Sequence, residues 1–169
     1  MIFLKTDRFQ LTNLRRSDTA ALVAIRQNPD CARYQRWSDT TPDAIDAYIA
    51  RHALDVFLSR AEEQHYALRT PDGALAGELS YFDNSKDCCI TLGITVAPAY
   101  QRQGYAHEML SAVVEAARAR HPQLEIVALI DRENEPSLRL FQKLGFTEEC
   151  YADSIGSYIY VIPAAQGQT

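Results

Sequence analysis

The feature that most constrains the fold is a strand that ends at a proline and continues, through a loop with one glycine, into a long amphipathic helix. Apolar residues alternate with smaller or polar ones over residues 88–96, which predicts a strand, and Pro98 ends it. Apolar residues recur at helical spacing over residues 104–120, which predicts a helix with one buried face. That face consists of Ala106, Met109, Leu110, Val113, Val114 and Ala117. Such a strand–loop–helix unit is typical of a mixed α/β domain.

The remaining elements follow from similar patterns. Strands are expected over residues 7–14, 65–70, 74–83 and 125–130, and a closing hairpin over residues 146–151 and 157–162. Helices are expected from Ser17 to about Arg26, from Thr41 and Pro42 to about residue 59, and from Asn134 to Gly145. This order predicts a single domain over residues 1–169, with its core at about residues 4–162.

Composition excludes several classes of protein. A chain of 169 residues is long enough to bury a core without a disulfide or a metal, and the four cysteines form no C-x-x-C pair. The net charge of −5 disfavours non-specific binding to nucleic acid or anionic lipid. No segment reaches the ~18 apolar residues of a membrane span. The expectation is a cytoplasmic protein that binds no nucleic acid, membrane or metal.

The start of the helix is a candidate anion site. The first amides of a helix have no partner inside it, and together with the helix dipole they attract phosphate. Gly104 allows close approach of a ligand to the backbone, and Ala106 is too small to block it. Neither the Walker loop nor the dinucleotide fingerprint is present. The segment is therefore either a phosphate site of another kind or an ordinary strand-to-helix turn.

Three segments resemble one superfamily. Gln101-Arg102-Gln103-Gly104-Tyr105-Ala106 resembles the Q/R-x-x-G-x-G/A acetyl-CoA loop of the GCN5-related N-acetyltransferases (GNAT), and residues 134–146 resemble their second motif. Residues 6–11 and 32–37 are similar to the branch of ribosomal-protein N-terminal acetyltransferases and their small-amine relatives. The resemblance covers residues 4–162. It implies the α/β fold of the GNAT superfamily. In that fold a mixed, mostly antiparallel central sheet is splayed at its fourth strand and flanked by about four helices.

The resemblance also implies acetyl-CoA as cosubstrate and no metal. In the family, the backbone of the stretch matching Ile94, Thr95 and Val96 pairs with the pantetheine arm, and an exposed amide near Ile94 stabilises the oxyanion. The diphosphate is then expected on a continuous segment. Its members are Gln101, Arg102, Gln103, Gly104, Tyr105, Ala106 and His107. Asn134 matches an asparagine that contacts the pantetheine arm, and it is equally suited to cap a helix.

The implied reaction is direct attack of a neutral amine on the thioester. Many members protonate the leaving thiolate with a tyrosine, but Phe141 stands at that position, and Ser137 matches the serine of the ribosomal-protein branch. Glu78 is a candidate general base, with a chain of waters or a merely solvated glutamate as alternatives.

Two functions remain open. The first is an N-acetyltransferase, monomeric or homodimeric, whose acceptor is a primary amine of a protein N-terminus or of a small molecule. The second is a catalytically silent acyl-CoA-binding sensor or partner module. The acceptor pocket is expected from the two early helices, with Tyr34, Trp37 and Tyr81 as walls and with Asp39 and Glu78 attracting a cationic amine.

Overall fold

The computed structural model describes residues 1–60 and 63–165 of the chain. The chain divides into two compact units, and each is described by itself. The first unit consists of Met1–Phe57, Gln64–Leu79 and Ile94–Tyr105. The second unit consists of Leu58–Glu63, Ser80–Gly93 and Ala106–Thr169.

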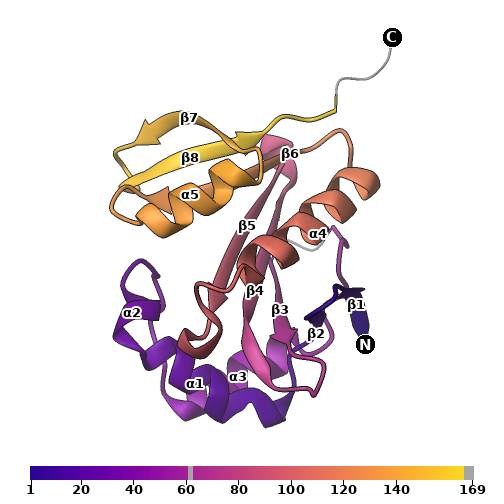
Figure 1. The fold of residues 1–169 in the computed structure, drawn as a ribbon, viewed down its shortest axis with the longest axis vertical. Helices are drawn as coiled ribbons and strands as arrows, with labels where there is room; N and C mark the ends of the chain where they lie inside the picture. The colour runs from indigo at the N-terminus through magenta and orange to yellow at the C-terminus, as the bar shows by residue number, and fades with distance from the viewer. Residues whose placement is uncertain (61–62, 166–169) are drawn as a thin grey trace. The chain divides into compact units, whose positions relative to one another are not determined.

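The described part of the chain contains eight strands and five α-helices (Figure 1). The strands are β1 (Ile2–Lys5), β2 (Gln10–Asn13), β3 (Glu63–Arg69), β4 (Leu75–Asn84), β5 (Cys89–Val96), β6 (Glu125–Asp131), β7 (Thr147–Ala152) and β8 (Ser157–Ile162). The helices are α1 (Thr19–Gln27), α2 (Pro29–Ala32), α3 (Pro42–His52), α4 (Tyr105–Arg120) and α5 (Glu135–Lys143). Among the helices so described, none has the length and apolar character needed to traverse a bilayer.

The strands are hydrogen-bonded in the order β1-β2-β3-β4-β5-β6-β8-β7. β1 and β2, β2 and β3, β6 and β8, and β7 and β8 pair antiparallel, whereas β5 and β6 pair parallel. This confirms the predicted mixed α/β fold with a mostly antiparallel sheet. The strand predicted over residues 88–96, which was expected to be the fourth in the chain, is the fifth strand, β5, because β1 was not expected. β1 pairs with β2 across a turn in which Thr6 N donates to Phe9 O at 2.9 Å, and so short an apolar run shows no alternation to detect.

Two helix boundaries also differ from the prediction. The first early helix was expected to end at about Arg26, and α1 ends at Gln27. A short helix that was not expected, α2, follows it, because the Asn28 side chain accepts hydrogen bonds from Asp30 N and Cys31 N and so caps α2. The second early helix, α3, was expected to reach residue 59 and ends at His52. Beyond this end, the backbone carbonyl of Asp55 accepts a hydrogen bond from Asn13 Nδ2 at 2.8 Å. This tertiary contact holds residues 53–57 outside the helix.

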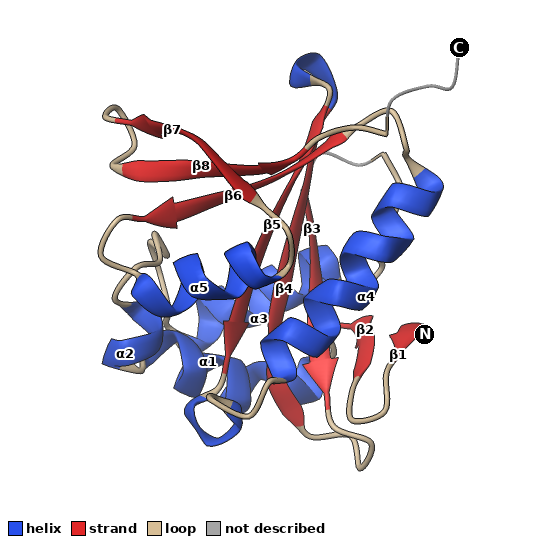
Figure 2. Ribbon diagram, turned by 45° about the horizontal axis from the view of Figure 1, so that its top comes forward, coloured by secondary structure: helices blue, strands red, loops and turns tan. Residues whose placement is uncertain are grey.

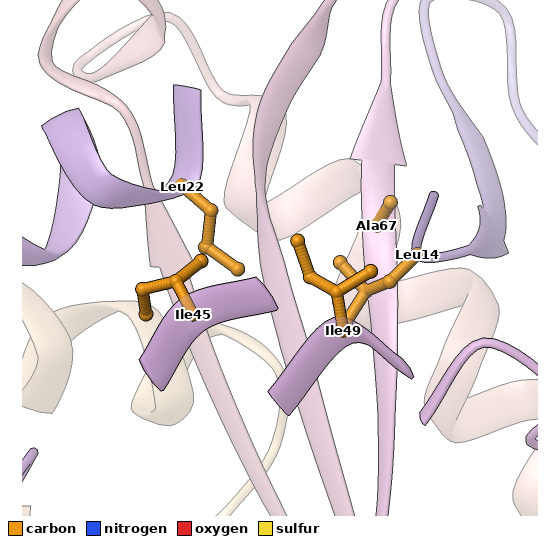
Figure 3. Packing of buried hydrophobic residues seen from close by; sticks show 5 residues of the cluster. All are labelled: Leu14, Leu22, Ile45, Ile49 and Ala67. Carbon is orange, nitrogen blue, oxygen red and sulfur yellow. The ribbon is translucent and has the colours of Figure 1, made fainter. Parts of the chain in front are cut away.

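The first unit has a core between its early helices and β3. α1 and α3 lie side by side (Figure 1). Leu22 of α1 and Ile45 and Ile49 of α3 are at most 2% exposed, and they pack with Leu14 and Ala67 (Figure 3). α3 begins as predicted, since Thr41 Oγ1 accepts a hydrogen bond from Ala44 N and Pro42 occupies the first turn. This core holds the helices that carry Arg26 and Tyr48.

The second unit is built on β6, β8 and β7, with α5 along one face (Figure 2). Gln142 Nε2 of α5 donates to the Tyr160 hydroxyl of β8 at 3.2 Å, and the rings of Phe141 and Phe146 meet edge to face at 5.0 Å. The predicted apolar face of α4 is buried from Met109 to Ala117. Gly145, with φ +88°, ends α5 in the left-handed conformation that the sequence predicted.

Candidate active site

The loop between β5 and α4 has the strand–loop–helix geometry that the sequence predicted. β5 ends at Val96, the 3-10 turn η3 spans Pro98–Tyr100, and α4 begins at Tyr105. Residues 101–104 are exposed. Within them Arg102 has φ +60° and Gly104 has φ +79°, so the chain turns sharply just before the helix. The loop therefore presents its backbone to solvent at the amino end of a sixteen-residue helix.

Two predicted cofactor side chains are engaged with the loop's own backbone. Gln101 Nε2 donates to Val96 O at 2.8 Å, and Gln103 Nε2 donates to Ala99 O at 2.9 Å. These bonds tie the loop to the end of β5 and to η3. Gln101 and Gln103 thus shape the loop from within.

The end of β5 offers backbone groups along one edge. Cys88 O accepts from Glu125 N on the β6 side, whereas Ala97 N donates to Ala76 O on the β4 side. Backbone groups of successive residues point alternately to the two sides of a strand, so the N–H and C=O of Ile94, three residues before Ala97, point to the edge directed away from β4. The parallel pairing of β5 with β6 covers Cys89 to Thr91, and β5 continues for five further residues. Ile94 therefore offers the kind of edge to which an extended, amide-containing ligand adds.

Gly77 lets β4 approach the end of β5. A Cβ on Gly77 would lie 2.3 Å from Thr95 O and 3.1 Å from Val96 Cα. Non-bonded Cβ contacts as short as 2.3 Å essentially do not occur, so any side chain at this position would displace the backbone of β5. Thr95 therefore directs its carbonyl toward β4, and Ile94 and Val96 direct theirs to the opposite edge.

Glu78 is buried inside the first unit, which excludes the solvated alternative. Arg26 Nη2 donates to Glu78 Oε1 at 2.6 Å, and Arg26 Nε donates to Oε2 at 3.3 Å. The Tyr48 hydroxyl also donates to Oε1, and His65 Nδ1 lies 3.4 Å from that oxygen. Burial would raise the pKa of the Glu78 carboxyl, but His65 and Arg26 outweigh it by hydrogen bonding and charge, so its pKa lies below the usual value. Glu78 is thus an ionised carboxylate and a weak base.

Arg26 connects the Glu78 carboxylate to two aromatic rings, of which Trp37 is one of the predicted walls. Its guanidinium lies over the Tyr48 ring at 4.0 Å and over the Trp37 ring at 5.2 Å. The charges of Arg26 and Glu78 cancel, so this pair does not by itself attract an ammonium group. The sequence pattern did not reveal Arg26, Tyr48 or His65, because they lie on three different elements.

The other predicted acceptor residues take different places. Asp39 is exposed and accepts a hydrogen bond from Thr41 N at 2.9 Å, so it supports the start of α3. Tyr34 is half-buried, with its ring 5.3 Å from the Arg33 guanidinium. Tyr81 is fully buried in the second unit, where burial and the Asp83 charge raise the pKa of its hydroxyl.

The predicted residues of the second motif lie in the second unit. Asn134 Oδ1 accepts a hydrogen bond from Ser137 N at 3.3 Å, so Asn134 caps α5. Ser137 is half-buried in the first turn. Phe141 is only 3% exposed and packs on Phe146, so a hydroxyl is absent from the position where many GNAT members carry tyrosine. Ala106 and His107 form the first turn of α4 in the same unit.

Comparisons with known proteins assign the family. The model of the acetyltransferase (GNAT) domain matches residues 8–147. The chain therefore belongs to the GNAT acetyltransferase family and is an acyltransferase. Enzymes of this family use acetyl-CoA as the acetyl donor.

Three relatives illustrate the likeness. The L-methionine sulfoximine/L-methionine sulfone acetyltransferase of Salmonella typhimurium is 28% identical over 83% of this chain and 81% of its own. The L-amino acid N-acyltransferase of Escherichia coli is 25% identical over 85% of this chain and 82% of its own. A GNAT-family acetyltransferase of Bacillus anthracis superposes with a TM-score of 0.82 at 19% identity, over 96% of this chain and 99% of its own, which is a likeness of fold.

The buried ion pair of Glu78 makes stability depend on pH. Because the folded pKa is lowered, the contribution of Glu78 is complete above its unfolded pKa of about 4.5 and is lost as pH falls through the folded value. Glu78→Gln should lower the free energy of unfolding at pH 7 by about 3 kcal/mol, since it leaves Arg26 buried without its counterion. Urea unfolding should show that this difference shrinks between pH 7 and pH 3.

A matched control for this measurement is Glu135→Gln. Glu135 pairs with Arg139 at 2.6 Å, but both side chains are at least 70% exposed, so the change should stay below about 0.5 kcal/mol. A Glu78→Gln deficit that is the same at both pH values would contradict the assigned pKa direction.

Proposed function

We propose that this protein is an N-acetyltransferase that transfers the acetyl group of acetyl-CoA to a primary α-amino group by direct attack. The observation that carries the proposal is the exposed loop of residues 101–104, with positive φ at Arg102 and Gly104, at the amino end of α4 and close in sequence to the edge of β5. Acetyl-CoA supplies an acetyl group activated as a thioester.

The loop fits the diphosphate of this cosubstrate. The chain carries a net charge of −5, so an anion must be held locally. Main-chain amides before and within the first turn of α4 supply donors and a favourable dipole. The exposed Arg102 adds a cationic side chain, whereas Gln101 and Gln103 stabilise the loop from within.

The edge of β5 fits the amide-containing arm of the same molecule. Ile94 carries an N–H and a C=O on the edge directed away from β4, and backbone pairing there would align the arm as an added strand. The Ile94 amide is our candidate for the donor that stabilises negative charge on the thioester carbonyl oxygen. Gly77 permits this arrangement because it has no Cβ to displace β5 from β4.

Two protons must move during the transfer. Ser137 is our candidate for protonating the leaving thiolate, because its hydroxyl lies in the first turn of α5 and Phe141 offers none. For the proton of the attacking amine we favour a relay of water molecules over Glu78. The lowered pKa of Glu78 and its bonds to Arg26 and Tyr48 make it a residue that organises the first unit rather than a proton acceptor.

The acceptor proposal rests on chemistry shared by two relatives. The names of the enzymes from Salmonella typhimurium and Escherichia coli describe acylation of amino acids or their analogues, and both align with more than four fifths of this chain. An α-amino group also occurs at a protein N-terminus, so the acceptor panel includes peptides with a free N-terminus.

Thiol release from acetyl-CoA tests the activity and the acceptor together. The panel contains free L-amino acids, methionine sulfone and sulfoximine, spermidine, and peptides with a free N-terminus. We expect release with one of the α-amines and none with acetylated versions of the same compounds. Tight binding of acetyl-CoA without release for any member would favour the silent acyl-CoA-binding module.

Gly104→Val should weaken acetyl-CoA binding at least tenfold in isothermal titration, because a β-branched residue is strained at φ +79° and would cover the amides of the loop. The matched control is Gly73→Val, which introduces the same β-branched residue at φ +93°, where a Cβ would have no atom within 4 Å. Equal acetyl-CoA affinities for both variants and the wild type would exclude this loop as the binding site of the diphosphate.

Ser137→Ala should lower kcat by about a hundredfold, in the range typical of a lost general acid, while acetyl-CoA affinity stays within twofold. Ser111→Ala, at a half-buried position on α4, serves as the control and should leave both values unchanged. An unaltered kcat, with a pre-steady-state burst absent, would exclude Ser137 as the proton donor.

A further inference from the structure

Arg8 reaches the candidate phosphate loop from a distant part of the sequence. It lies in the turn between β1 and β2, and its Nη1 donates to Gln103 O at 2.9 Å. Its guanidinium carbon lies 4.2 Å from the centre of the Tyr105 ring. Both contacts are inside the first unit, and the reaction described above assigns Arg8 no role. Arg8 therefore joins the first hairpin to the loop and to the first residue of α4.

The bond to Gln103 O fixes the direction of the next amide. In a trans peptide the C=O of one residue and the N–H of the following residue point in opposite directions, and the described chain contains no cis peptide bond. A Gln103 carbonyl held toward Arg8 therefore directs the Gly104 N–H away from Arg8. A flipped peptide would instead turn an oxygen toward the side where the phosphate is proposed to bind.

The backbone at this point needs such a restraint. The Gln103–Gly104 peptide follows Arg102, which has φ +60°, and leads into Gly104, which has φ +79°. Glycine adopts positive and negative φ with similar ease, so the conformation of Gly104 alone does not fix this peptide. Gln103 Nε2 binds Ala99 O, so the side chain of Gln103 restrains its own end of the loop but not the direction of its carbonyl. The hydrogen bond from Arg8 restrains that carbonyl directly.

Arg8 is itself held in place. Phe9 is 1% exposed and meets the Tyr105 ring edge to face at 4.5 Å, so the residue next to Arg8 is anchored in the core. The turn is closed by Phe9 N donating to Thr6 Oγ1 at 3.1 Å. Arg8 Nη2 would lie 3.5 Å from a Cβ on Gly104, so the guanidinium packs across the glycine from the hairpin side.

We propose that Arg8 is a positioning residue that orients the Gln103–Gly104 peptide so that its N–H faces the diphosphate of the cosubstrate. This inference rests on the proposed function, because it specifies how the same loop recognises the anion. Arg8 acts through the backbone of the loop, and the competing role is that of a direct phosphate ligand.

The test compares Arg8→Met and Arg8→Lys with the wild type. The first removes the donor, and the second keeps a charge and an ammonium donor group but loses the planar stacking on Tyr105. We expect the dissociation constants of acetyl-CoA and of inorganic pyrophosphate to rise about tenfold for Arg8→Met and less for Arg8→Lys, which corresponds to one lost charge-assisted hydrogen bond. kcat at saturating acetyl-CoA should stay within twofold.

A truncated donor separates this role from a general structural one. S-acetylpantetheine lacks the diphosphate, so kcat/KM with this donor should be the same for the wild type and Arg8→Met. Arg16→Met is the control for charge, because Arg16 belongs to the same unit and its side chain is 90% exposed. The urea midpoint verifies that each variant is folded.

Salt dependence distinguishes positioning from direct contact. Plots of log Kd for pyrophosphate against log salt should be parallel for the wild type and Arg8→Met, whereas a shallower slope for Arg8→Met means that Arg8 itself meets the phosphate and overturns the positioning role. Unchanged affinities in Arg8→Met, with a wild type that binds acetyl-CoA, overturn the inference alone. A wild type that binds neither acetyl-CoA nor pyrophosphate overturns the proposed function and the inference together.

Discussion

The close approach of β4 to β5 at Gly77 is the constraint on which the candidate site depends. The Thr95 carbonyl occupies the space that a Cβ on Gly77 would need, so glycine at this position permits the end of β5 to lie against β4, where Ala97 N donates to Ala76 O at 2.8 Å. The alternation of backbone groups then leaves Ile94 and Val96 directed to the other edge. Gln101 uses the Val96 carbonyl on that edge to anchor the loop that follows. The position of the loop and the direction of the Ile94 amide thus have one physical origin.

The proposed site would combine main-chain recognition of an anion with an internally neutralised ion pair. An acidic chain cannot rely on its overall field to attract an anionic cosubstrate, and a helix start preceded by a sharply turned loop needs no net positive charge to do so. In the first unit, the charges of Arg26 and Glu78 neutralise each other, and the Tyr48 hydroxyl donates a further hydrogen bond to the carboxylate. A buried pair of this kind fixes the geometry of its neighbours, since breaking it exposes an uncompensated charge.

The side chains predicted to bind the cofactor or to act in catalysis have different roles in the structure. Gln101, Gln103 and Asn134 bind backbone atoms of their own segments, so their first effect is to shape a loop or to cap a helix. Glu78 is fixed by partners from three other elements, and this changes its expected chemistry from a proton acceptor to an ion-paired anchor. Ser137 keeps its proposed role, which kinetics must test.

Local sequence by itself determined the elements whose signals are local. The alternation in β5, the helical spacing in α4 and the Asn134 and Thr41 caps predicted these elements, and the strand–glycine–helix pattern predicted the loop. Resemblance of residues 101–106 and 134–146 to two known motifs supplied the family. β1 was missed because four residues carry no measurable period, and α3 was predicted too long because Asn13 holds residue 55 from a distant segment. Only the tertiary structure decided the partners of Glu78 and the contact of Arg8 with Gln103, because these depend on which residues meet across 52 and 95 positions of chain.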